Sequence, residues 1–137
     1  MKKLLAIIII FLSPKFFSQE SVSSTVENSV VDNYVYEKVD KIAEYPGGIN
    51  SFRKLISKNM YIEGITERGI LQSDAQFVIS ENGKLENIKV LGDNKDMNRQ
   101  VAQAIKSQNK TKWKPGEING KPVKSLFKLS IAMQINN

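Results

Sequence analysis

The carboxy-terminal segment constrains the fold most, because its apolar residues alternate with more polar ones from Val123 to Asn136. A period of two places successive side chains on opposite faces of a β-strand. The segment therefore predicts a long terminal strand with one face on a hydrophobic core. The residues on that face would be Val123, Ser125, Phe127, Leu129, Ile131, Met133 and Ile135.

Two other segments have the spacing of amphipathic helices. After the turn cluster Tyr45–Gly48, apolar residues recur at steps of three and four from Ile49 to Met60. A similar stripe runs from Met97 to Ile105 and follows the capping residues Asp93 and Asn94. Each stripe covers one side only, so each helix is expected to pack against another layer.

The strand signals complete the predicted fold. Ala75–Ile79 and Leu85–Leu91 flank Asn82-Gly83, which predicts a β-hairpin with a tight two-residue turn. Residues 34–40 alternate partly and predict a short extra strand, and residues 61–73 are interpreted as a connector. The predicted fold class is α+β: a two-layer sandwich in which two helices cover one face of an antiparallel sheet of about three strands.

The composition excludes several kinds of chemistry. The chain has 137 residues and no histidine or cysteine, so it holds no histidine-based triad, thiol nucleophile, tetrahedral zinc site or disulfide. Carboxylate catalysis remains open, but the candidate acids lie in polar, turn-like stretches without the protected pocket that an acid–base pair needs. We expect no enzyme, no cofactor and no metal site. The candidate acids are Glu81, Glu86, Asp93 and Asp96.

The amino terminus has the features of a secretory signal peptide. Lys2 and Lys3 precede an apolar run, Leu4–Leu12, that ends at Ser13-Pro14. We predict a signal peptide over residues 1–18, a flexible tail over residues 19–33 and a folded domain over residues 34–137. A spanning helix needs about 20 apolar residues, and this run is shorter. A membrane anchor is the alternative only if residues 4–17 are not cleaved.

The charge balance argues against a nucleic-acid partner. The formal net charge is +6, and cleavage would remove Lys2, Lys3 and Lys15 to leave +3. Seven lysines lie between Lys106 and Lys128 with Glu117 as the only acid among them, and such a run is typical of a solvated face.

Several short motifs follow one another along the chain: Ala43–Gly48, Phe77–Ile79, Glu81–Leu85, Ile88–Leu91, Lys112–Gly116 and Asn119–Val123. In this order and spacing, they resemble the C-terminal domain of TonB energy transducers in the form found in Bacteroidetes. The resemblance covers about residues 35–136. Its most specific part is Trp-Lys-Pro-Gly followed by Asn-Gly-Lys-Pro-Val before a terminal strand.

The resemblance implies a function in binding. TonB couples an inner-membrane motor to outer-membrane receptors, and its C-terminal domain grips a receptor segment, the TonB box, as an added strand along its last strand. This implies a periplasmic protein that binds TonB-box segments or another envelope protein by β-strand addition. The implied partner-binding residues are Val123, Lys124, Ser125, Leu126, Phe127, Lys128, Leu129, Ser130 and Ile131.

One departure from the family and one alternative function accompany this hypothesis. Residues 19–33 contain no proline and would span at most ~50 Å at ~3.3 Å per residue, so we expect a short stand-alone domain without energy transduction. A periplasmic scaffold or homodimer could use the same edge strand to pair with its own copy. The lysines on that strand would either tune partner selectivity or protect the edge from aggregation.

Overall fold

The computed structural model describes residues 33–136. The predicted signal peptide, residues 1–18, and the predicted tail up to residue 32 lie outside this range. Within the described residues, no helix is long and apolar enough to cross a membrane.

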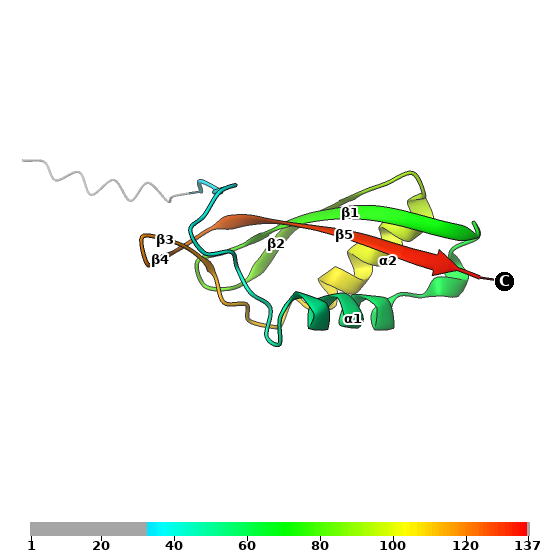
Figure 1. Ribbon diagram of the computed structural model, residues 1–137, viewed down its shortest axis with the longest axis horizontal. Coiled ribbons are helices and arrows are strands. Elements are labelled where there is room, and N and C mark those ends of the chain that lie inside the picture. The colour runs from blue at the N-terminus through cyan, green and yellow to red at the C-terminus, as the bar shows by residue number, and fades with distance from the viewer. Residues whose placement is uncertain (1–32, 137) are drawn as a thin grey trace, which may run out of the picture. The chain divides into compact units, whose positions relative to one another are not determined.

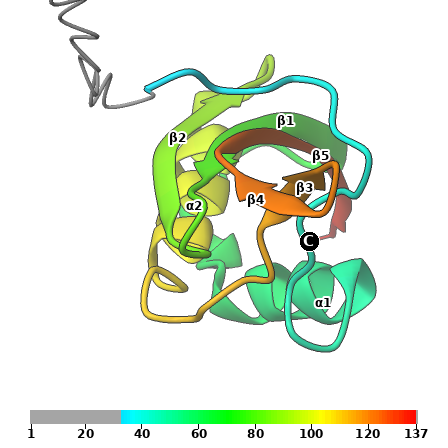
Figure 2. The same ribbon diagram turned by 90° about the vertical axis from the view of Figure 1, so that its left-hand side faces the viewer.

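The described residues form two layers (Figure 1). Three antiparallel strands, β1 (Gly69–Ile79), β2 (Leu85–Leu91) and β5 (Ser125–Ile135), form a sheet in the order β2-β1-β5. Helices α1 (Ile49–Asn59) and α2 (Lys95–Lys106) lie on the same side of this sheet, as Figures 1 and 2 show. A short 3₁₀-helix η1 (Ile62–Gly64) follows α1, and β3 (Gly116–Ile118) and β4 (Lys121–Val123) form a separate two-stranded sheet. The predicted fold class is confirmed.

Strand β1 begins at Gly69, so the predicted connector over residues 61–73 is wrong in its second half. Leu71 and Ser73 are buried toward the helices, whereas Gln72 and Asp74 point to solvent. The alternation was hidden because the inward positions include Ser73 and the outward positions include Ile70, which is 77% exposed. β1 therefore pairs with β5 along its whole length, from Gly69 opposite Ile135 to Ile79 opposite Ser125.

The predicted strand over residues 34–40 is also wrong, because this segment makes only isolated bridges. Tyr36 pairs in parallel with Ser125, and Lys41 pairs with Glu117. The segment thus passes from the start of β5 to β3 instead of following one strand.

The predicted terminal strand divides at Lys124 into β4 and β5. β4 pairs with β3, with Val123 opposite Gly116, whereas β5 pairs with β1. The alternation in the sequence continues across this division, so it gives no sign that the two parts belong to different sheets.

The hairpin between β1 and β2 is present, but its turn is longer than predicted. The Ser80 N–H donates to the Lys84 carbonyl at 2.9 Å, which leaves Glu81, Asn82 and Gly83 as a three-residue loop. Gly83 alone takes a left-handed backbone there, with φ 80. A three-residue loop that ends on a left-handed glycine is the next most common hairpin connection.

An aromatic cluster forms the core beneath the sheet. Trp113 is 1% exposed and packs against four rings, with centroid distances between 4.9 and 5.5 Å and steep angles between the ring planes. Trp113 is therefore a core residue, and the burial of Leu129, Ile131 and Ile135 confirms the odd-numbered side of β5 as the core face. The four rings are Tyr45, Phe52, Phe77 and Phe127.

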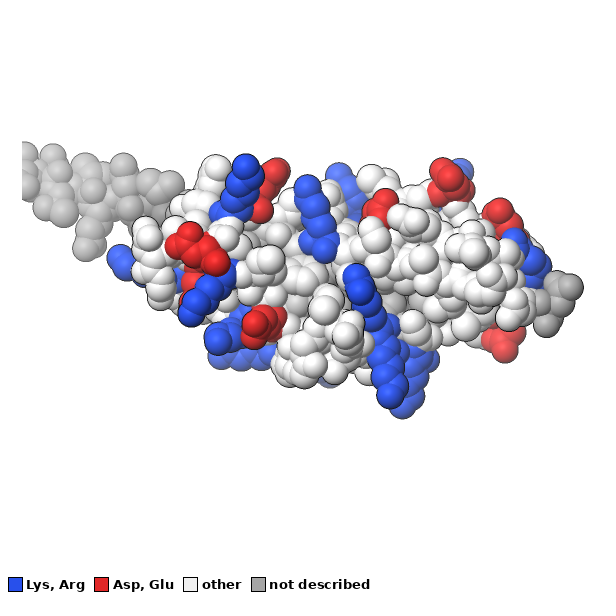
Figure 3. All heavy atoms as spheres, viewed as in Figure 1, with Lys and Arg blue, Asp and Glu red and all other residues white. Residues whose placement is uncertain are grey.

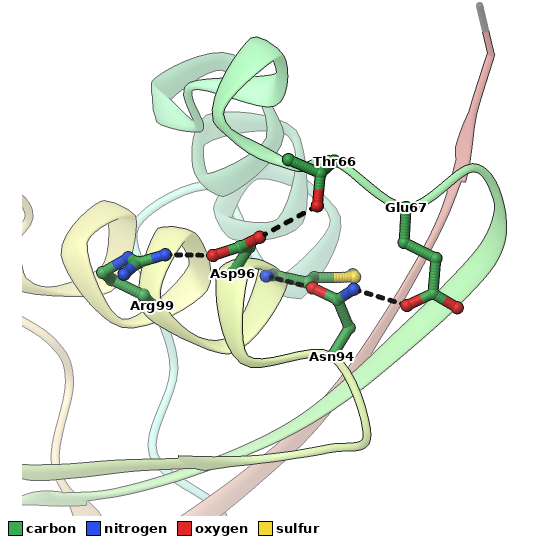
Figure 4. A network of polar contacts seen from close by, with 6 residues as sticks. Thr66, Glu67, Asn94, Asp96 and Arg99 are labelled. Carbon is green, nitrogen blue, oxygen red and sulfur yellow. Dashed lines mark hydrogen bonds and ion pairs between the residues drawn. The ribbon is translucent and has the colours of Figure 1, made fainter.

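The start of α2 is fixed by polar contacts (Figure 4). The Asn94 side chain accepts a hydrogen bond from the Met97 N–H at 2.8 Å, as expected of a helix cap, and donates to Glu67 at 2.6 Å. Asp96 accepts from the Thr66 hydroxyl at 3.4 Å and forms an ion pair with Arg99. These contacts join α2 to the segment that leads into β1.

Candidate functional site

Strand β5 is an edge strand, and the structure shows which of its backbone groups face outward. The Tyr36 N–H donates to the Lys124 carbonyl and the Leu126 N–H donates to the Tyr36 carbonyl, both at 2.9 Å. Because the N–H and C=O of one residue point to the same flank and alternate along a strand, the even-numbered residues of β5 face away from β1. Odd-numbered residues pair with β1.

Beyond the Tyr36 bridge, this outer flank has no internal partner within residues 33–136. Its unpaired N–H and C=O groups form a regular row because the pairing with β1 runs without a bulge. Such a row is a template for another strand. The unpaired residues are Lys128, Ser130, Ala132 and Gln134. These four residues define what we call the open flank.

The opposite edge of the sheet, on β2, is irregular. The pairing passes from Gln76 opposite Lys89 to Val78 opposite Glu86, so β2 carries one extra residue. Asn87 lies in this bulge with φ 51. A bulge bends an edge and interrupts its hydrogen-bonding row, which protects it from pairing. The regular edge available to a partner is therefore the one on β5.

The lysines of the edge are not equivalent. Lys124 is half-buried and its Nζ lies 3.4 Å from Glu86. Lys128 is exposed and forms no ion pair with any other described residue. Asp74, opposite Ser130 on β1, accepts hydrogen bonds from Ser130 and Gln72, and these bonds lower the pKa of its carboxyl. We call the surface of the sheet that faces away from the helices the open face. It thus presents a free cation at Lys128 and an anion beside Ser130.

Two hollows meet beside the first half of β5, at Ile42 and Phe127. One, of about 690 Å³, is lined by residues 37–39 and 42 together with Ser125–Lys128. The other, of about 600 Å³, adds Tyr45 and Ile49. Ile42 is 69% exposed although it has apolar neighbours in the hollow. Figure 2 shows α1 beneath the β5 side of the sheet and α2 beneath the β2 side.

The structure places the predicted site residues in three different settings. Val123 belongs to β4 and pairs with Gly116, and the Lys124 carbonyl is occupied by Tyr36. Ser125, Phe127, Leu129 and Ile131 direct their backbone to β1 and their side chains toward the core. Within the predicted range, only Lys128 and Ser130 belong to the open flank, which continues to Ala132 and Gln134. Whether a partner binds these residues stays a prediction.

Sequence reasoning missed Tyr36 and Ile42. Tyr36 ends the open flank by its parallel bridge, and Ile42 lines both hollows. Ile42 had one signal, namely a large apolar residue between Lys41 and Glu44 that belongs to no helical or strand stripe.

Within residues 33–136, the other ion pairs are separate contacts between one acidic and one basic side chain. Asp96 contacts Arg99 and Glu86 contacts Lys124. Within residues 33–136, no three acidic side chains are placed to hold a metal ion. Basic side chains lie over α1 in Figure 3, and both signs are mixed on the rest of that face. Six of the seven lysines between Lys106 and Lys128 are exposed, which agrees with a solvated face.

No family model matches the chain, and no curated protein matches it. A search of solved structures finds the TonB C-terminal domain of Helicobacter pylori, determined in solution by NMR. The chain is similar to this domain. The identity is 30%, the match covers 67% of this chain and 88% of that one, and the TM-score is 0.43.

Proposed function

We propose that residues 33–136 form a protein-binding module of the TonB C-terminal type, which takes up an extended segment of an outer-membrane receptor along β5. The observation that carries this proposal is the open flank, with its regular row of unpaired backbone groups. Main-chain pairing along such an edge supplies affinity, and the side chains around it supply specificity. The ordered sequence motifs that resemble TonB domains give the class of partner.

The proposed role is binding without catalysis, in the periplasm after export. A strand-addition site needs neither a cofactor nor a metal, because its recognition groups are backbone amides and carbonyls. Two of the candidate acids, Glu86 and Asp96, form ion pairs with Lys124 and Arg99.

A titration with TonB-box peptides, followed by NMR of the ¹⁵N-labelled mature chain, tests this proposal. We expect chemical-shift changes on the open flank, Lys128–Gln134, and much smaller ones on β2. Ala132→Pro would remove one outward N–H and should weaken binding. Ala132→Ser is the matched control, because it changes the same exposed side chain and keeps the N–H. Absence of shifts on β5 at millimolar peptide would refute the proposal.

Homodimer formation is the second candidate, and the same open flank favours it. Ser130 and Ala132 lie near the centre of the open flank and have small side chains. A second copy of β5 could therefore pair antiparallel about a two-fold axis without a clash between facing side chains. Sedimentation at micromolar concentration distinguishes the two functions. A tight dimer that loses its association in Ala132→Pro would favour self-pairing over receptor binding.

A further inference from the structure

The side chains around the open flank suggest what kind of segment fits it, and this step rests on the proposed function. A strand added beside β5 alternates its side chains between the two faces of the sheet. Its residue opposite Phe127 would point toward the helices, and its residue opposite Lys128 would point toward the open face. These two positions therefore meet different surroundings.

The helix-facing position meets a preformed apolar hollow. Ile42 from the amino-terminal segment, Ile49 from α1 and Phe127 from β5 line it together. Ile42 is 69% exposed and Phe127 is half-buried, so an entering apolar side chain would remove both from water. Helix α1 lies beneath the β5 side of the sheet (Figure 2), and its first residue, Ile49, lines the hollow beside Phe127.

The open-face position meets charge. Lys128 is exposed and has no ion-pair partner within the described range, so an acidic side chain directly opposite it gains a favourable cross-strand pair. The next open-face position, opposite Ser130, lies near Asp74, which accepts the Ser130 hydroxyl. The Asp74 carboxylate would repel an acidic residue there. The charges on the open face therefore favour an acidic residue opposite Lys128 and not opposite Ser130.

Tyr36 limits the register. It occupies the Lys124 carbonyl and the Leu126 N–H, and residues 37–39 line the hollow beside Ser125–Lys128, so an added strand must end near Phe127. Antiparallel pairing is the commoner arrangement between strands. An antiparallel segment would run from Gln134 toward Lys128 and place its last paired residue opposite Phe127.

We infer that the Ile42–Ile49–Phe127 hollow is an anchor subsite for one bulky apolar side chain of the bound strand, immediately preceded by an acidic residue that pairs with Lys128. The partner is thus an extended segment with an acidic–apolar pair at its carboxy-terminal end. Ile42 and Lys128 determine specificity, while the backbone row supplies binding that is independent of sequence.

The inference is tested with blocked peptides in a double-mutant cycle. The probe is Ser-Thr-Ser-Val-Thr-Val-Glu-Leu, with versions that carry Phe or Ala in place of the final leucine. We expect Leu and Phe peptides to bind about 10-fold more tightly than the Ala peptide. Ile42→Ala should remove most of this difference and leave the affinity for the Ala peptide within about two-fold.

Ile70→Ala is the matched control. Ile70 is 77% exposed, like Ile42 a solvent-facing isoleucine, but it lies on β1 outside both hollows. It should leave the Leu-to-Ala affinity ratio unchanged. For the charge pair, Lys128→Glu should weaken the Glu-containing peptide several-fold, and a Glu-to-Lys peptide should restore binding.

The outcomes separate this inference from the proposed function. If no peptide shifts the open-flank amides, the proposed function fails and the subsite with it. If all peptides shift those amides but Leu, Phe and Ala versions bind equally, or Ile42→Ala weakens them equally, strand addition stands and the subsite is refuted. Loss of the Leu-to-Ala difference in Ile42→Ala alone, and not in Ile70→Ala, supports the subsite.

Discussion

Phe127 shows how a single side chain links the core to the candidate binding edge. Its ring stacks on Phe77 at a centroid distance of 5.3 Å and 20° between planes, and meets Trp113 edge-on. The ring is only half-buried, and its remaining surface lines both hollows beside β5. The part of each hollow that Phe127 lines is therefore positioned by core packing, which keeps it in place before any partner binds.

Asp74 allows a prediction about pH. The hydrogen bonds from Ser130 and Gln72 lower its pKa in the folded state, so they stabilise the fold when the carboxyl is ionised. This contribution is present above the ordinary pKa of an aspartate and is lost as the pH falls through the lowered value. We expect the difference in melting temperature between the native chain and Asp74→Asn to shrink between pH 7 and pH 2. A difference that grows on acidification would contradict this account.

At the scale of elements, the sequence was informative where periodicity was strong. The stripe from Ile49 to Met60, the cap Asn94 and the inward face of β5 were all predicted, because apolar spacing and capping chemistry act locally. The length of β1 was not predicted, because a serine at an inward position interrupts the apolar pattern. Only the structure shows that Ser73 is buried and that its hydroxyl donates a hydrogen bond to Asn98.

The parts of the site that were missed depend on tertiary contacts. The Tyr36 bridge joins residues far apart in the chain, and the exposure of Ile42 beside Phe127 follows from the path of residues 36–44 between β5 and β3. Neither leaves a local pattern. The edge position of β5 depends on sheet order, which alternation alone does not determine.

The β1–β2 loop gives a prediction at this scale. The Gly83 carbonyl accepts a hydrogen bond from the Trp113 N–H at 2.9 Å, and a Cβ on Gly83 would lie 2.1 Å from the Trp113 carbonyl oxygen. Gly83→Ala should therefore destabilise the fold by about 1–3 kcal/mol more than backbone strain alone.

Gly120→Ala is the control for that strain, because Gly120 has φ +75 and a Cβ added there would have nothing within 4 Å. It should cost about 1–2 kcal/mol, the strain of a left-handed residue. Urea unfolding of both variants gives the comparison. Equal losses would show that the loop moves freely away from Trp113.

At the scale of the folded unit, residues 33–136 combine one protected edge with one open edge. The β2 edge carries a bulge at Asn87, and the β5 edge is regular and ends at the Tyr36 bridge. Helix α1 lies beneath the β5 side of the sheet (Figure 2), and β5 has no strand of the three-stranded sheet on its outer flank. A bound segment would complete the sheet.

Hydrogen–deuterium exchange of the free, mature chain tests this central claim most directly, because protection reports whether each amide is bonded. Amides of Phe127, Leu129 and Ile131 face β1 and should exchange slowly. Those of Lys128, Ser130 and Ala132 face outward and should exchange about 100-fold faster or more. Protection that alternates in this way along β5 is the predicted result. Equal, strong protection of all six amides would show that the flank is already occupied and would contradict the account.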